Sequence, residues 1–369
     1  MGEPILCSES ANTTSMRNLL PVIVFLLTAC CVQAESHASD STAVAWRGPV
    51  SGPAAQRNKN IVFVSQDSNN GGISSLYRHF QLAAQQLGWK LEYIDSRNNL
   101  ESAKSAVLQA GRAKADAIVL GGVSLSSLRD EARRVKRQGI ILLGWHAAAE
   151  PGPTEDLFNN IATPSFAVAQ MAAQYVVQNS EGKVGVVIFN DARFEVANAK
   201  TESMRKIISQ CDRCRVLSIE NISLGQTVTE IPKAVDRLVA EFGAAWTHSL
   251  AINDLYFDSI NFPLRKHNRT DIRNISAGDG SFQALNRIRS GLSTQVATVA
   301  EPAGVQGWQL ADELNRAFAG APPSGYVTEP LLITYESVHK TDIYNLGGDI
   351  PYRQWYEKIW FGAPIPSTQ

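Results

Sequence analysis

Short apolar segments alternate with amphipathic segments along most of this chain, and this alternation constrains its fold more than any other feature. Strands that are apolar on both faces and alternate with amphipathic helices predict parallel sheets covered by helices on both sides. Between apolar runs, residues such as Leu76, Phe80, Ala83 and Leu87 recur at helical spacing. The predicted strands cover 61–65, 91–95, 117–121, 140–145, 184–189, 215–219, 249–252, 273–276 and 295–299, and the predicted helices between them include 100–113, 125–138, 166–178, 196–209, 231–241 and 282–290.

The alternation restarts after Thr163-Pro164, which predicts two α/β lobes in a chain of 369 residues. The sequence contains no Walker A motif and no GxGxxG that opens a helix after a strand, so a nucleotide-binding enzyme lacks its main support. The 34 Lys and Arg residues balance 35 Asp and Glu residues, which argues against a nucleic-acid partner.

The first segment, 1–34, is interpreted as an upstream extension followed by a signal peptide. Met16-Arg17-Asn18 opens a short basic region, 19–32 is uncharged and apolar, and Val32-Gln33-Ala34 is a small-x-small cleavage pattern. A competing interpretation is a lipobox that ends at Cys30, which would anchor the mature protein through a lipid. Either way we expect export to the periplasm, followed by a flexible leader over 35–57 that is rich in Ser, Ala, Gly and Pro.

The remaining cysteine pair outside this segment is Cys211 and Cys214, between a predicted helix and a predicted strand. In an oxidising compartment this spacing is typical of a structural disulfide. A thioredoxin-like role is disfavoured because the motif ends a helix, and a zinc site lacks a second ligand pair. We expect no metal, no cofactor and no catalytic residue.

In this order and spacing, the motifs resemble the type I periplasmic binding proteins of the ribose- and galactose-binding kind. The resemblance extends from about Asn60 to Leu346 and is carried by the segments Ile61–Leu87 with Asn69-Asn70, Ala251-Ile252-Asn253-Asp254, Ile275-Ser276-Ala277-Gly278-Asp279-Gly280 and Thr298-Val299-Ala300-Glu301-Pro302. It implies two Rossmann-like lobes with parallel sheets, joined by a hinge of three segments.

The resemblance also implies lobes built from separate pieces of the chain. We expect a first lobe of 58–162 plus 301–329 and a second lobe of 163–300 plus 330–369. The crossovers are expected near Ala162-Thr163, Gly278-Asp279 and Ala300-Glu301. Ligand would bind at the carboxyl ends of the strands, and hinge closure would bury it.

Polar residues that follow the predicted strands are the candidate ligand-binding residues. Asp279 and Glu301 are expected to accept hydrogen bonds from ligand hydroxyl groups, and Asn253 to donate and accept them. Asp254 is expected to cap the helix that follows it. Asp67 and Asn70 lie on the first strand-to-helix loop, where their alternative role is ordinary turn chemistry.

Trp145 and His146 stand where relatives that bind pentoses and hexoses often have Asp-Arg, so the ligand is not expected to be a common free aldose. Trp145 would stack on a ring or a cation, or pack as a core residue. Asn198 stands where relatives often have a ligand-binding Arg, and Arg193 would supply that charge one turn earlier. Because buried carboxylates at 279 and 301 need compensation, either Arg193 provides it or the ligand is cationic.

The function implied is the solute-binding component of an ABC importer. As a monomer without enzymatic activity, it would capture a sugar, polyol or sugar-like molecule and present it to an inner-membrane permease. A periplasmic sensor that presents its ligand to a membrane receptor is the main alternative. A secreted α/β enzyme is less well supported, because no GxSxG elbow or metal cluster is evident.

Overall fold

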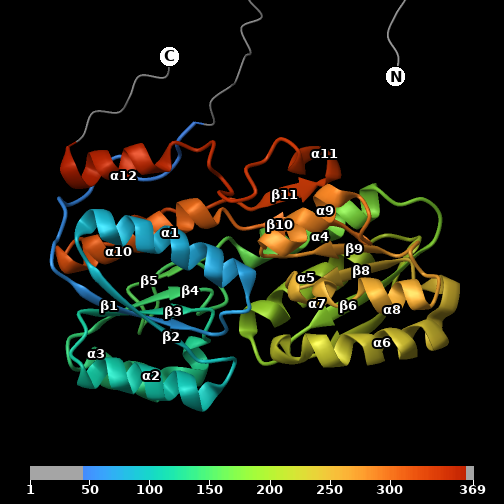
Figure 1. Ribbon diagram of the computed structural model, residues 1–369, viewed down its shortest axis with the longest axis horizontal. Helices are drawn as coiled ribbons and strands as arrows, with labels where there is room; N and C mark the ends of the chain where they lie inside the picture. Colours follow the sequence, from blue (N-terminus) through green and yellow to red (C-terminus); the bar gives the residue numbers. More distant parts are fainter. Residues whose placement is uncertain (1–44, 363–369) are drawn as a thin grey trace, which may run out of the picture. The chain divides into compact units, whose positions relative to one another are not determined.

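Two β-sheets organise the chain in the computed structural model, which describes residues 45–362 (Figure 1). The first sheet has the order β2-β1-β3-β4-β5 and the second β11-β10-β9-β8-β6-β7. All pairs of neighbouring strands are parallel except β10 and β11. The strands are β1 (Asn60–Ser65), β2 (Lys90–Asp95), β3 (Ala117–Gly121), β4 (Ile141–Trp145), β5 (Asn159–Ile161), β6 (Val184–Asn190), β7 (Cys214–Asn221), β8 (His248–Ala251), β9 (Arg273–Ser276), β10 (Gln295–Ala300) and β11 (Leu331–Thr334). The predicted α/β fold with parallel sheets is confirmed.

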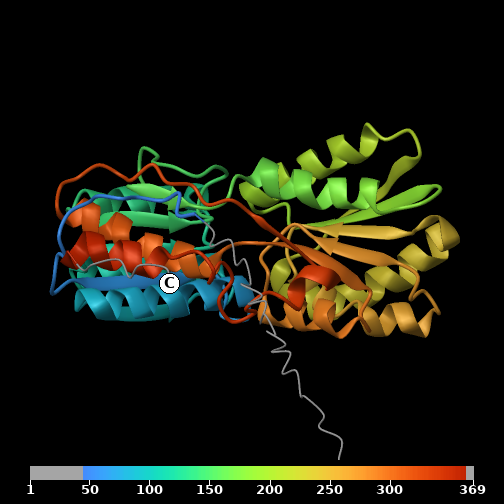
Figure 2. The same cartoon turned by 90° about the horizontal axis from the view of Figure 1, so that it is seen from above.

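Helices cover both faces of each sheet. On the first sheet, α1 and α10 lie on one face and α2 and α3 on the other (Figure 1). On the second sheet, α4 and α5 lie opposite α6, α8 and α9 (Figure 2). The α-helices are α1 (Gly71–Leu87), α2 (Leu100–Arg112), α3 (Arg129–Lys136), α4 (Ser165–Gln178), α5 (Glu195–Ser209), α6 (Thr227–Phe242), α7 (Leu255–Asp258), α8 (Asn261–Lys266), α9 (Phe282–Ser290), α10 (Ala303–Phe318), α11 (Tyr335–Val338) and α12 (Tyr352–Phe361); the short 3-10 helices are η1 (Leu125–Leu128), η2 (Leu224–Gln226) and η3 (Gly243–Ala245).

The strands form the cores because they are apolar on both faces. Every residue of β3 and β6 is buried, and only the first residue of β1 is exposed. We call each sheet with the helices packed on it a lobe. The hydrophobic clusters of the two lobes are separate: one gathers on β1, β3 and β4 with α1 and α10, another on β6, β8 and β10 with α4 and α5.

The chain passes between the two lobes through four connections. After β5 it continues into α4, which packs on the second sheet, and after β10 it returns to α10, which packs on α1. A third connection, 319–330, leads from α10 to β11, which pairs with β10. A fourth, 339–351, leads from α11 to α12, which packs on α10 of the first lobe. The expected crossover at Gly278-Asp279 is wrong, because the helix that follows, α9, packs on β10 and α11 of the same lobe.

The C-terminal helix α12 lies on the first lobe, not on the second as predicted for 330–369. Its large aromatic residues Tyr352, Tyr356 and Trp360 recur every four positions, so they form one face. That face packs against α10, where the rings of Trp360 and Trp308 stack with centroids 5.5 Å apart. Burial of these aromatic rings stabilises the packing of α12 on the first lobe.

The predicted flexible leader is wrong for 45–57. Although this segment has no helix or strand, it is bound to the first lobe by side chains of α10. Arg316 Nη2 donates to the carbonyl of Ser51 at 2.7 Å, and Asn315 Oδ1 accepts from the amide of Gln56 at 2.7 Å. Trp46 packs against Tyr356 of α12, with ring centroids 5.4 Å apart. The predicted signal peptide, Cys30 and the start of the leader lie outside the described residues.

Cys211 and Cys214 lie at the junction of α5 and β7, with their Cα atoms 5.2 Å apart. That separation is within the range of disulfide geometry. Among residues 45–362, no helix has the length and apolar character that a membrane crossing requires.

Candidate functional site

A hollow lies where the carboxyl ends of strands from both sheets face one another. We call it the central hollow. Open α/β sheets bind ligands at this end because the loops there bring side chains from several strands together. Its walls come from α1, α5 and the segments that follow β1, β3, β4, β6, β7, β8 and β9: Gln66, Asn70, Ile73, Gly122, Trp145, His146, Phe194, Val196, Ala197, Lys200, Leu224, Ile252, Asn253 and Asp279.

Asp279 is the acidic residue of the central hollow and is only 8% exposed. Asn253 Nδ2 donates to its Oδ2 at 2.6 Å, so these two predicted residues do lie together. Burial raises the pKa of the Asp279 carboxyl, and the charge of Lys200 partly opposes this. The carboxylate also faces the first turn of α1, whose partial positive charge favours an anion.

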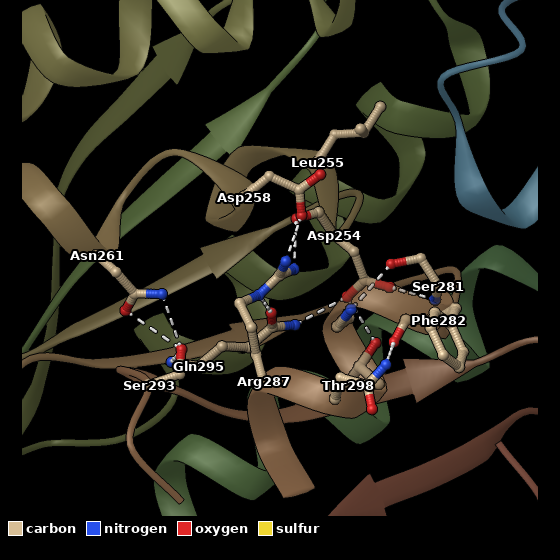
Figure 3. A network of polar contacts seen from close by, with 12 residues as sticks. Asp254, Leu255, Asp258, Asn261, Ser281, Phe282, Arg287, Ser293, Gln295 and Thr298 are labelled. Carbon is tan, nitrogen blue, oxygen red and sulfur yellow. Dashed lines mark hydrogen bonds and ion pairs between the residues drawn. The ribbon is translucent and has the colours of Figure 1, made fainter. Parts of the chain in front are cut away.

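The loop that carries Asp279 is held by Asp254 (Figure 3). Asp254 Oδ2 accepts from the main-chain amides of Asp279, Gly280 and Ser281 at 3.2, 2.8 and 2.9 Å. Its other oxygen accepts from Gln295 Nε2 at 2.8 Å and Thr298 Oγ1 at 3.0 Å. The predicted role of Asp254 as a helix cap is therefore wrong: its side chain makes no bond to the helix that follows.

Arg287 extends this network away from the hollow. Its Nε donates to Gln295 Oε1 at 2.9 Å, and its Nη1 pairs with Asp258 Oδ1 at 2.5 Å (Figure 3). Gln295, which donates to Asp254, is thus itself held by Arg287, and this network stabilises the loop that carries Asp279.

Lys200 is the cation of the central hollow, and the sequence analysis did not predict it. It lies on α5 and is 4% exposed, and its Nζ donates to the carbonyl of Ala277 at 2.8 Å. The sequence did contain a signal for the burial of Lys200, because it shares its helix face with the buried residues Ala197, Met204 and Ile208. Burying a lysine on the apolar face of a helix costs free energy unless its ammonium group has a hydrogen-bond or charge partner.

Glu301 lies behind the hollow and does not line it. Thr163 Oγ1 donates to Glu301 Oε1 at 2.6 Å, and Gln306 Nε2 donates to Oε2 at 2.7 Å. Burial alone would raise the pKa of Glu301, but the imidazole of His146, the ammonium of Lys200 and the hydrogen bond from Thr163 lower it to about 2. The carboxylate thus bonds the connection that follows β10 to the connection that follows β5.

His146 and Trp145 both line the central hollow at the end of β4. His146 has a left-handed backbone, with φ of 50°, which turns its ring toward Glu301; Nε2 lies 3.3 Å from Glu301 Oε1. Trp145 is 2% exposed, belongs to the core of the first lobe, and donates through Nε1 to Gln306 Oε1 at 2.8 Å. It is a core residue whose edge forms part of the wall.

Asn70 and Asp67 differ in their placement although both lie on the loop after β1. Asn70 lines the hollow, and its Oδ1 caps α1 by accepting from the amides of Gly72 and Ile73 at 2.9 and 3.3 Å. Asp67 does not line it; its Oδ1 accepts from the amide of Asn69 at 2.9 Å, which is turn chemistry.

Arg193 and Asn198 also lie outside the central hollow. Arg193 donates through Nε and Nη2 to the two carboxylate oxygens of Asp191, at 2.8 and 2.6 Å. It therefore compensates Asp191 and not the carboxylates at 279 and 301, whose cation is Lys200. Asn198 accepts from Asn190 Nδ2 and donates to the carbonyl of Ala192, both at 3.0 Å, which holds the loop after β6.

Phe194 and Gln66 line the hollow but were not among the predicted residues. Phe194 is half-buried directly before α5, with the guanidinium of Arg193 over its ring at 5.4 Å. An aromatic face of this kind packs well on the C–H face of a sugar ring. Its place immediately after the predicted residue Arg193 was the available signal.

These residues form a site suited to binding polar molecules. Hydrogen-bonding groups from both lobes meet an aromatic ring and aliphatic side chains, which is the composition of small-molecule pockets. Within 45–362 no group of His, Cys, Asp and Glu has the arrangement of a metal site.

The sequence was compared with protein families, curated proteins and solved structures. Residues 61–322 match the family described as periplasmic binding protein domain. The comparison with curated proteins gave no significant match.

Solved structures similar to this chain have the same two-lobe fold. An ABC transporter solute binding protein from Agrobacterium vitis with bound allitol matches with a TM-score of 0.68 and 17% identity, over 77% of this chain and 98% of that one. An ABC sugar transporter subunit from Rhodobacter sphaeroides matches with a TM-score of 0.66 and 19% identity, over 75% and 98%. A Caulobacter myo-inositol binding protein bound to myo-inositol matches with a TM-score of 0.67 and 18% identity, over 79% and 97%. At these identities the likeness establishes the fold. Together with the family match over most of the described residues, it means that this chain belongs to the periplasmic binding protein domain family.

Proposed function

We propose that this protein is the exported solute-binding component of an ABC importer, and that it captures a neutral polyhydroxylated molecule in the central hollow. The observation that carries the proposal is the pairing of Asp279 with Asn253 beside Lys200, at the meeting point of both sheets. The allitol and myo-inositol bound to two structural neighbours are ligands of this class.

The chemistry of recognition follows from the atoms that face the hollow. Asp279 accepts hydrogen bonds from ligand hydroxyls, while Lys200 and Asn70 donate to hydroxyl oxygens. Hydrogen bonds to charged groups contribute about 1.5–3 kcal/mol each. Phe194 and Trp145 contact the carbon face of the ring. A few such bonds together with buried ring area account for affinities of about 1 μM, which correspond to roughly −8 kcal/mol.

The charge balance favours a neutral ligand. Lys200 offsets the carboxylate of Asp279, and Glu301 is satisfied by Thr163 and Gln306. A cationic ligand would duplicate the charge of Lys200, and an anionic one would be repelled by Asp279. Lys200, and not Arg193 or a cationic ligand, is therefore the proposed compensating charge for Asp279.

Capture by closure of the two lobes follows from their connections. The chain passes between the lobes after β5, after β10, after α10 and after α11, and hinge motions are absorbed at a few such residues. Release to an inner-membrane permease would complete the cycle. Binding alone is required, so the protein is proposed not to be an enzyme. Export to the periplasm would depend on the segment 1–34.

The test is ligand binding by the mature protein, measured by thermal shift and isothermal calorimetry. The panel contains allitol, myo-inositol, glucose, galactose and arabinose, with a cationic amine and an anionic sugar acid as class controls. We expect a neutral member to bind, and Asp279→Asn to weaken that binding at least tenfold. Asp349→Asn is the matched control, because Asp349 lies on an exposed loop. Binding of charged molecules only, or turnover of the ligand, would contradict the proposal.

A further inference from the structure

A second hollow adjoins the central hollow. We call it the side hollow. Gln66 and Phe194 line both hollows, so the two spaces meet at these side chains. Its remaining walls come from the loops after β2 and β3, from the start of α2, and from the loop before α5: Ser96, Asn98, Asn99, Leu100, Ala103, Val123, Ser124, Ser127 and Arg193.

The walls of the side hollow combine polar and apolar surfaces. Hydroxyl and amide groups of Ser127, Ser124 and Asn99 stand beside the aliphatic side chains of Leu100 and Val123. A sugar ring has the same two-sided character, because its hydroxyls lie around the edge and its C–H groups on the faces. Mixed surfaces with an aromatic wall therefore fit a sugar better than they fit a purely apolar group.

Arg193 offers an unused donor to this space. Its Nε and Nη2 are held by Asp191 and Ser223, while its Nη1 has no hydrogen-bond partner within the part of the chain that the structure describes. The fixed guanidinium can donate to a hydroxyl oxygen without first being ordered, which reduces the entropy cost of binding.

The two lobes also touch beside the side hollow, at its wall residue Asn98. Gly225 of η2 lies so close to Asn98 that a Cβ atom built on the glycine would be 2.4 Å from Asn98 Nδ2. Asn98 is itself fixed, because its Oδ1 accepts from Gln66 Nε2 at 3.1 Å and its amide donates to the Gln66 carbonyl at 2.6 Å. The side hollow thus has walls from both lobes and adjoins the central hollow, with which it shares Gln66 and Phe194.

We propose that the side hollow is a second sugar subsite and that the ligand of this protein is a disaccharide. One ring occupies the central hollow against Asp279 and Lys200, and the second ring lies against Phe194 within reach of Arg193 and Ser127. This inference rests on the proposed function and narrows its substrate class from polyhydroxylated molecules to two-ring sugars.

The test compares disaccharides with their component monosaccharides by isothermal calorimetry. The probes are maltose, cellobiose, lactose, melibiose, trehalose and sucrose, with glucose, galactose and fructose. At least one disaccharide is expected to bind ten or more times more tightly than either of its components. Ser127→Trp fills the side hollow and is expected to remove that advantage while the monosaccharide affinity changes less than twofold. Ser126→Trp, an exposed neighbour that lines neither hollow, is the matched control.

The outcomes separate this inference from the function on which it rests. Monosaccharide binding with no gain from any disaccharide would overturn the second subsite and leave the proposed function standing. A disaccharide advantage that survives Ser127→Trp would also overturn it. Retained monosaccharide binding by Ser127→Trp shows that the variant is folded. Failure of every sugar here and of every neutral molecule of the first panel to bind the wild-type protein would overturn both.

Discussion

Gly72, in the first turn of α1, lies directly against Asp279: a Cβ atom built on the glycine would be 2.5 Å from the aspartate Cβ. The neighbouring Gly71 has the same relation to Ser281, where the distance would be 2.7 Å. The two glycines thus allow the amino end of a helix in the first lobe to touch the loop that carries the acidic residue of the second. Any side chain at these positions would keep the two apart.

Gly72→Ala is expected to weaken ligand binding at least tenfold. Gly72 has no left-handed φ, so an alanine is not strained there, and by helix propensity alone it would stabilise α1 by about 1 kcal/mol. The clash of the alanine Cβ with Asp279 opposes this stabilisation. Calorimetric titration of the variant measures the loss. Gln81→Ala, at an exposed position of the same helix, should bind like the wild type, and equal affinity of all three proteins would contradict the close contact.

Lys200→Met is expected to weaken ligand binding at least tenfold and to lower the free energy of unfolding. The methionine keeps the length of the side chain but removes the charge that faces Asp279 and Glu301. Because an unpaired buried carboxylate can recover by taking up a proton, the loss of stability should be smaller at pH 4 than at pH 7. Urea denaturation at both pH values measures it.

The matched control for this variant is Lys206→Met on the exposed side of the same helix. It should change neither the affinity nor the stability by a measurable amount. If the two variants behaved alike, Lys200 would have no special electrostatic role in the hollow.

The positions of Asn70, His146, Asn253 and Asp279 could be predicted because they depend on a local rule. Each follows a strand of a parallel sheet, and the carboxyl ends of such strands meet at one edge. Apolar runs of strand length located those ends to within a residue or two.

Other features depend on contacts between residues that are far apart in the sequence. The carboxylate of Glu301 accepts a hydrogen bond from Thr163, which lies 138 residues away in the sequence. The position of Glu301 behind the hollow could therefore not be inferred. Arg193 is held by Asp191 and by Ser223, which lies 30 residues away, so it does not reach the carboxylates at 279 and 301. The C-terminal helix was assigned to the wrong lobe because only the tertiary contact of Trp360 with Trp308 decides it.

Replacement of Cys211 and Cys214 by serine is expected to lower the free energy of unfolding by about 2 kcal/mol or less. We expect the two residues to form a disulfide in the oxidised protein, and a short loop gains little chain entropy from being closed. Thiol titration of the unfolded, unreduced mature protein tests the bond itself and should detect neither thiol of this pair. Two reactive thiols at these positions would contradict it. Ligand affinity should not change, because neither residue lines the central hollow.

Glu313→Gln is expected to make the protein more stable above pH 7 and to have little effect below pH 4.5. Glu313 is fully buried on α10, where burial raises its pKa to about 7 although Ser324 donates hydrogen bonds to it. Of the charged groups beside it, Asp312 raises the pKa further and Arg316 lowers it. A folded-state pKa above the unfolded value of 4.5 means that folding favours the protonated carboxyl. Stability from this group is therefore complete below pH 4.5 and is lost as the pH rises through 7.

A difference of this size between the folded and unfolded pKa corresponds to about 3 kcal/mol. Glutamine keeps the shape of the side chain without ionising. The variant should therefore not lose this contribution to the free energy of unfolding as the pH rises. Urea denaturation of both proteins at pH 4.5, 6 and 8 gives the difference in free energy of unfolding at each pH. That difference should grow with pH. A difference that stayed constant, or that shrank toward pH 8, would mean that folding does not raise the pKa of Glu313.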